Sequence, residues 1–183
     1  MKWFGKAYLA LLAVALPLPL AAQQPPLTVS AANPEGVLQA LRFAGYDAEL
    51  VTDDVGDPMI ETDFSNLSGS VMFYGCNEET HERCSSLQLR VGLDRAEPMS
   101  PELLNREFGD DRFYAVHLDD EGDPWFNWDI MTGTGDGIPT SVFLLAVKEF
   151  STQVGAASTV VFAEELEKEI DFSAPEQREA ETI

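Results

Sequence analysis

A hexapeptide of the pattern D-D-x-G-D-P occurs twice in this chain, and this repeat constrains the fold more than any other feature of the sequence. The two copies span residues 53–58 and 119–124. Asp and Gly favour tight turns, because Asp hydrogen-bonds to nearby backbone and Gly adopts positive φ without strain. Each copy is followed by a segment in which apolar residues alternate. The repeat therefore predicts two β-hairpins whose turns are the acidic hexapeptides.

A short helix is predicted before each hairpin. Asn33-Pro34-Glu35 and Ser100-Pro101-Glu102 are typical helix starts, because Asn or Ser caps the first turn and Pro fits the first helical position. The apolar spacing that follows ends at Gly45 and at Gly109. The same order of helix, strand, turn and strand thus occurs twice, which suggests an internal duplication.

The remaining segments complete an α+β fold. Residues 70–74 and 87–93 have the composition of strands, and a long helix is predicted from about Pro139 to Val161. Gly155 inside that helix costs about 1 kcal/mol relative to Ala and favours a kink or break. The predicted order is α-ββ-ββ-α-ββ-α, with an antiparallel sheet and helices packed on one face.

The first residues predict export. Lys2 and Lys6 precede a short apolar run that Pro17 interrupts, and small residues follow, as in a bacterial secretory signal peptide. An uncleaved anchor is the alternative, but the run is short for a membrane span. We expect a periplasmic or secreted protein without a membrane span after cleavage. The expected parts are a signal peptide (1–22), a flexible lead (23–32), a folded domain (33–163) and an acidic tail (164–183).

The chain is strongly acidic, with 32 Asp and Glu against 11 Lys and Arg and a net charge of −21. A surface of this charge repels phosphate groups. Nucleic acid and anionic membranes are therefore poor partners, and high solubility is the simplest consequence of the charge.

Cys76 and Cys84 are expected to form a disulfide, because a closely spaced pair in an exported protein is most often bridged. The bridge would close the base of a polar loop between two strands and stabilise the fold by about 2–3 kcal/mol. A soft-metal site that includes His81 is the alternative interpretation. The C-x-x-C spacing of redox motifs is absent from the sequence.

The acidic turns raise the question of calcium. Asp119, Glu121 and Asp123 alternate as oxygen ligands do, but a helix-loop-helix calcium site needs about twelve residues and a bidentate acid at its end. A turn is the preferred interpretation, and a calcium-responsive module is the alternative. We expect no cofactor and no catalytic residues, since neither His81 nor His117 accompanies a nucleophile motif and the glycine-rich segment 133–137 lacks the lysine of phosphate loops.

The alternation in the hairpins predicts a second apolar face on the sheet. If one set of side chains faces the helices, Met59 and Trp125 must point the other way, together with Phe113 and one of Met72 and Phe73. A second copy of the protein, the last helix or a client polypeptide would cover this face. Met59, Phe113 and Trp125 are the candidate partner-binding residues. The set expected to face the helices is Ile60, Phe64, Phe126, Trp128 and Ile130.

Three segments, residues 84–93, 103–106 and 113–124, resemble the YbjN family of bacterial proteins in that order. The resemblance covers about residues 33–163. It implies a regulator of sensory transduction with a fold similar to type III secretion chaperones, which is not a catalytic scaffold. The signal peptide and the cysteine pair depart from the family's cytoplasmic members. We therefore expect an exported, non-catalytic, protein-binding or chaperone-like regulatory module that binds a protein partner or a second copy of itself as a homodimer.

Overall fold

The computed structural model describes residues 24–163, so the predicted signal peptide and acidic tail lie outside the described residues. Within residues 24–163, none of the helices combines the length and the apolar content needed to cross a membrane. Along the chain the elements are β1 (Thr28–Val29), α1 (Pro34–Phe43), β2 (Ala48–Thr52), β3 (Pro58–Phe64), β4 (Leu67–Tyr74), β5 (Ser86–Gly92), α2 (Pro101–Phe108), β6 (Ala115–Leu118), β7 (Pro124–Met131), β8 (Ile138–Pro139) and α3 (Thr140–Val161).

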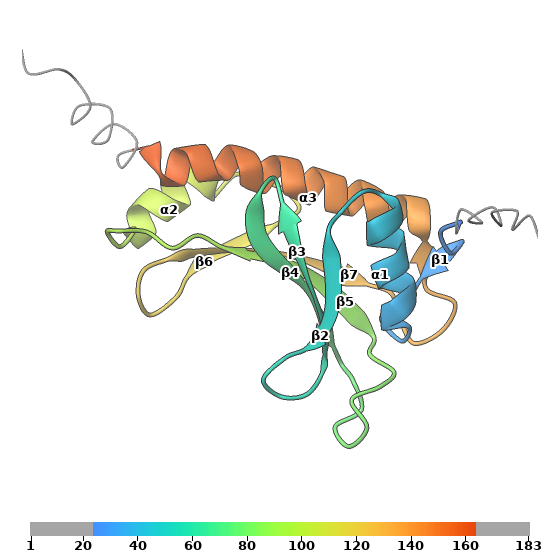
Figure 1. The fold of residues 1–183 in the computed structure, drawn as a ribbon. Coiled ribbons are helices and arrows are strands. Elements are labelled where there is room, and N and C mark those ends of the chain that lie inside the picture. Colours follow the sequence, from blue (N-terminus) through green and yellow to red (C-terminus); the bar gives the residue numbers. More distant parts are fainter. Residues whose placement is uncertain (1–23, 164–183) are drawn as a thin grey trace, which may run out of the picture.

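Six strands form one sheet in the order β2-β3-β4-β5-β7-β6, and all neighbours are antiparallel. Figure 1 shows α3 running along one face of this sheet, with α1 beside its beginning and α2 beside its end. The predicted α+β class, with an antiparallel sheet and helices on one face, is confirmed.

Aromatic side chains join the sheet to the helices. Phe64 of β3 packs edge-on against Phe150 of α3 at 5.0 Å between ring centroids, and Phe126 of β7 packs against Phe108 of α2 at 5.3 Å. Phe150 and both strand residues are fully buried, and Phe108 nearly so. The predicted helix-facing set is therefore on the correct side of the sheet, although Trp128 stays partly exposed.

The helix starts are as predicted. Asn33 Oδ1 accepts a hydrogen bond from the Gly36 N–H, and Ser100 Oγ accepts one from the Leu103 N–H. Pro follows each cap within the first helical turn. These caps fix where α1 and α2 begin, and hence where the following hairpins start.

The two acidic hexapeptides form hairpin turns with the same hydrogen bonds, which confirms the turn prediction. Asp53 Oδ1 accepts from the N–H groups of Val55 and Asp57, and Asp119 Oδ1 accepts from those of Glu121 and Asp123. The glycine of each turn has positive φ, +96° at Gly56 and +86° at Gly122. The β2–β3 and β6–β7 hairpins lie at opposite edges of the sheet. An internal duplication stays a prediction.

Residues 28–32, which belong to the segment predicted as a flexible lead, are part of the fold, and this differs from the expectation for them. β1 pairs with β8, and the backbone N–H of Thr140 donates to Leu27 O. Val29 is 1% exposed and Ala31 is fully buried. The prediction failed because two paired residues are too few to give a periodic signal.

Helix α3 continues through Gly155 without a break. A Cβ atom at this position would lie 2.5 Å from Ser65 Oγ. Ser65 and Asn66 form the β3–β4 turn, with φ of 54° and 64°. Gly155 therefore allows the turn to approach the helix, and tertiary packing outweighs its low helix propensity.

Candidate functional site

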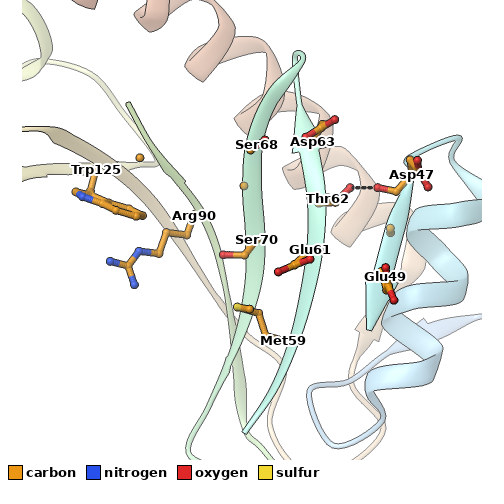
Figure 2. Close-up of a pocket in the computed structure, with 13 residues that line it drawn as sticks. Asp47, Glu49, Met59, Glu61, Thr62, Asp63, Ser68, Ser70, Arg90 and Trp125 are labelled. Carbon is orange, nitrogen blue, oxygen red and sulfur yellow. Dashed lines mark hydrogen bonds between the residues drawn. The ribbon is translucent and has the colours of Figure 1, made fainter. Parts of the chain in front are cut away.

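The face of the sheet turned away from the helices carries a groove of about 640 Å³. We call this surface the open face, because the helices of the described chain all lie on the other side. Figure 2 shows its side chains, which come from β2, β3, β4, β5 and β7. Those that define it are Glu49, Met59, Glu61, Asp63, Ser70, Arg90 and Trp125.

Trp125 lies flat on the open face, where three contacts fix it. Its register partner is Gly92, and a Cβ atom there would lie 2.7 Å from the indole ring. The indole Nε1 donates a hydrogen bond of 2.8 Å to Asp119 Oδ2. The Arg90 guanidinium lies 4.1 Å from the ring centroid, as in a cation–π contact. Trp125 is thus a half-buried aromatic side chain that these contacts hold in place on the open face.

Arg90 presents the only positive charge among the residues that line the groove. Its neighbours across the strands are Ser70 and Asn127, which are uncharged. Its Nε is shielded from solvent and has no hydrogen-bond partner among the described residues. The guanidinium is therefore held by the indole of Trp125 and not by a carboxylate.

The opposite wall of the groove is acidic. Glu49 of β2 and Glu61 of β3 are register partners, so their side chains leave the same face of the sheet side by side. Asp63 follows on the same strand and face, and Asp47 precedes β2. The open face was predicted to be unusually apolar. In the structure one side of it is acidic. The alternation that exposes Met59 also exposes Glu61 and Asp63.

The structure separates the three candidate partner-binding residues. Met59 and Trp125 share the open face, and Met72 is the register partner of Met59, whereas Phe73 is buried. Phe113 lies on the helix side, where it stacks on Trp128 at 5.3 Å between ring centroids. The expectation that Phe113 accompanies Trp125 is wrong, because Phe113 precedes β6 and its side chain does not follow the strand alternation.

Phe113 borders a second hollow, of about 480 Å³, between α2 and the end of α3. Phe113 is 62% exposed and has a φ of 78°, which is unusual for an aromatic residue. Beside it the Tyr114 hydroxyl donates to Asp111 Oδ2. The pKa of Tyr114 is raised, first by burial and then by this hydrogen bond to the Asp111 carboxylate. The contacts of Phe113 and Tyr114 are explained by the packing of α2 against β6 and do not require a ligand.

Two of the three residues of the calcium alternative, Asp119 and Asp123, already use their carboxylates in hydrogen bonds. Asp119 uses both carboxylate oxygens within the turn and with Trp125, and Asp123 Oδ1 accepts from the backbone N–H of Arg95. In residues 24–163 no cluster of three or more His, Cys, Asp or Glu side chains has a geometry suited to a metal ion. A metal ion at this turn would compete with these hydrogen bonds for the carboxylate oxygens of Asp119 and Asp123.

Cys76 and Cys84 form the expected disulfide. His81, in the loop that the disulfide closes, contacts Asp57 of the first acidic turn at 2.8 Å from Nδ1 to Oδ1. Its ring also lies over Gly56, where a Cβ atom would be 3.3 Å from two ring atoms. His81 therefore joins the disulfide loop to the first hairpin, and the two sulfur atoms that the soft-metal alternative needs are bonded to each other.

The charged side chains of the groove, Arg90 on one side and the pair Glu49 and Glu61 on the other, were not predicted from the sequence. The signal was present in the alternation of β5, where Leu87, Leu89 and Val91 face the core and Arg90 must face away. The pairing of Glu49 with Glu61 required the register of β2 and β3, which the length of the acidic turn determines.

The sequence model of the YbjN family, described as "Putative bacterial sensory transduction regulator", matches residues 33–161. This chain belongs to the YbjN family. No curated protein matches the chain. Membership in the YbjN family suggests a role in the regulation of sensory transduction.

Proposed function

We propose that this YbjN protein is an exported, non-catalytic regulatory module that binds another polypeptide through its open face. The observation that carries the proposal is Trp125, held flat between Gly92 and Arg90 on a face that no described helix covers. Aromatic and arginine side chains that are already positioned are the usual energetic centres of protein interfaces, because little entropy is lost when they bind.

The contacts of the two histidines support a binding role for the protein and not a catalytic one. His81 contacts Asp57, and the Nδ1 atom of His117 lies 3.1 Å from Asn127 Nδ2. In both contacts the histidine meets a turn or strand side chain and not a hydroxyl or thiol that it could activate. A non-catalytic role is the simplest function that accounts for these contacts.

The cysteines and the first residues support the proposed compartment. A disulfide persists in oxidising compartments, so the Cys76–Cys84 bridge supports a periplasmic or secreted location. The n-region and apolar run of residues 1–22 support the same location.

A chaperone-like mode of action, expected from the resemblance to type III secretion chaperones, is part of this proposal.

A crosslinking pulldown from the cell envelope tests the function. Wild-type protein is compared with Trp125→Ala and with Phe113→Ala, which removes an exposed aromatic side chain from the opposite side of the sheet. We expect polypeptides that Phe113→Ala retains and Trp125→Ala loses. A protein that is monomeric and whose Trp125→Ala form retains every partner would contradict the proposal.

The calcium-responsive module is the alternative function. Calorimetric titration with calcium, together with the thermal unfolding midpoint, separates the two functions. Heat of binding that disappears in Asp119→Asn would favour calcium. We expect neither heat nor a shift of the midpoint, because the oxygens of Asp119 already accept hydrogen bonds.

A further inference from the structure

We propose that the groove of the open face binds an extended polypeptide segment that carries basic residues, an inference that rests on the proposed function and names the chemical class of the partner. The lining residues include four carboxylates, Asp47, Glu49, Glu61 and Asp63, against the single guanidinium of Arg90. The two kinds of charge lie on opposite sides of the groove (Figure 2).

The acidic side is unfavourable for the isolated fold. Like charges directly opposite each other on neighbouring strands are destabilising, and Glu49 and Glu61 are such a pair. Neither forms an ion pair or a side-chain hydrogen bond with another residue of the described chain. A local arrangement that costs stability without compensation is expected at a functional surface. A lysine or arginine of a partner, placed between the two carboxylates, would remove the repulsion.

The other side of the groove suits a peptide backbone and an apolar side chain. The Arg90 guanidinium has no carboxylate or carbonyl acceptor among the described residues and can donate to one from a ligand. The exposed surface of Trp125 offers an apolar contact beside the guanidinium, and Met59 of β3 offers another across the groove. Between the two sides β4 contributes the small side chains of Ser68 and Ser70, which leave the space that forms the groove, and the backbone of Gly69.

An extended segment matches this arrangement. Its side chains alternate in direction, so basic side chains reach Glu49 and Glu61 while apolar ones meet Trp125. The net charge of −21 also attracts a basic partner over long range. A second copy of the protein would bring the same negative charge, which disfavours it as the occupant.

Fluorescence anisotropy with labelled peptides tests the inference on the full exported chain. The probe alternates Lys and Val, and the matched probe alternates Glu and Val. The variant Glu49→Gln/Glu61→Gln removes two charges from the groove. The control Glu102→Gln/Glu149→Gln removes two exposed charges from α2 and α3 on the helix side. We expect the groove variant to weaken binding of the Lys/Val probe about tenfold, and the control variant less than twofold.

The unfolding midpoint provides a second readout. Because Glu49→Gln/Glu61→Gln removes a like-charge pair, we expect it to unfold at the same or a higher urea concentration than wild type while it binds the probe more weakly. Equal weakening by the control variant, or equal affinity for the Glu/Val probe, would overturn the inference. So would a wild-type dimer that the groove variant dissociates.

Failure of this inference is distinguishable from failure of the proposed function. If Trp125→Ala loses its partners in the pulldown while Glu49→Gln/Glu61→Gln binds the Lys/Val probe as wild type does, the open face is an interface but its partner is not basic, and the inference is overturned. If both the groove variant and Trp125→Ala weaken probe binding, the inference is supported together with the open face.

Discussion

The hydrogen bond from Trp125 Nε1 to Asp119 Oδ2, at 2.8 Å, connects the second acidic turn to the open face of the sheet. The first turn has no such bond, because Met59 stands where the second hairpin has Trp125. One hairpin therefore carries an anchored aromatic side chain and the other carries a flexible apolar one. The repeated turn has a structural role in both hairpins, and in the second it also positions a candidate binding residue.

Asp119 is expected to make the stability of the protein depend on pH. Its pKa lies below the ordinary value of 3.8, first because the Trp125 indole hydrogen-bonds to the carboxylate and then because the Asp123 N–H does. The carboxylate therefore stabilises the fold above pH 3.8, and this contribution is lost as the pH falls through the lowered pKa. We expect the urea midpoint of wild type to fall more steeply in acid than that of Asp119→Asn. Parallel midpoints over the whole range would show that the carboxylate makes no such contribution.

Gly155 is expected to respond to substitution in the opposite direction from an ordinary helix glycine. Gly→Ala within a helix commonly stabilises by about 1 kcal/mol, but here the new Cβ would lie 2.5 Å from Ser65 Oγ. We expect Gly155→Ala to lower the free energy of unfolding by about 1–3 kcal/mol. In the double variant Gly155→Ala/Ser65→Gly much of this loss should be regained, since glycine also suits the φ of 54° at residue 65. Additive effects in the double variant would rule out the contact as the cause.

Val29 should behave as a core residue although it precedes the family domain. It is 1% exposed, and β1 holds it against β8. We expect Val29→Ala to lower the free energy of unfolding by about 2 kcal/mol. The matched control is Val142→Ala on α3, where the side chain is 53% exposed and the change should be within about 0.5 kcal/mol. Equal effects of the two substitutions, measured by urea unfolding, would contradict the placement of β1.

Removal of the disulfide is expected to destabilise the protein and release His81 from the first turn. We expect Cys76→Ala/Cys84→Ala to lower the free energy of unfolding by about 2–3 kcal/mol. Reductant should lower the free energy of unfolding of wild type by a similar amount. The double variant, which has no bridge to reduce, should keep the same free energy of unfolding. In NMR spectra the Gly56 amide, which lies below the His81 ring, should shift in both cases. An unchanged Gly56 signal would show that the bridge does not hold this loop in place.

The sequence allowed the local architecture to be predicted because each part depends on nearby residues. The caps at Asn33 and Ser100, the acidic turns and the alternation around Phe126 all have short-range signals, and the structure has them as expected. The pairing of Cys76 with Cys84 was likewise available from spacing and context.

The remainder depends on contacts between distant residues. The burial of Val29, the approach of Ser65 to Gly155 and the pairing of Glu49 with Glu61 arise from how the elements meet. The position of Phe113 on the helix side depends on a left-handed backbone angle, which a period-two pattern does not reveal. For these reasons the open face was predicted in part: Met59 and Trp125 lie on it as expected, and its acidic side was missed.

The open face is the proposed binding surface of this protein. Photocrosslinking in cells tests this directly, with a benzophenone amino acid in place of Met59 on the open face or of Leu145 on the outer side of α3. We predict polypeptide adducts from position 59 that disappear when Trp125→Ala is added, and none from position 145. Adducts from position 145 alone, or adducts from position 59 that Trp125→Ala leaves unchanged, would contradict the claim.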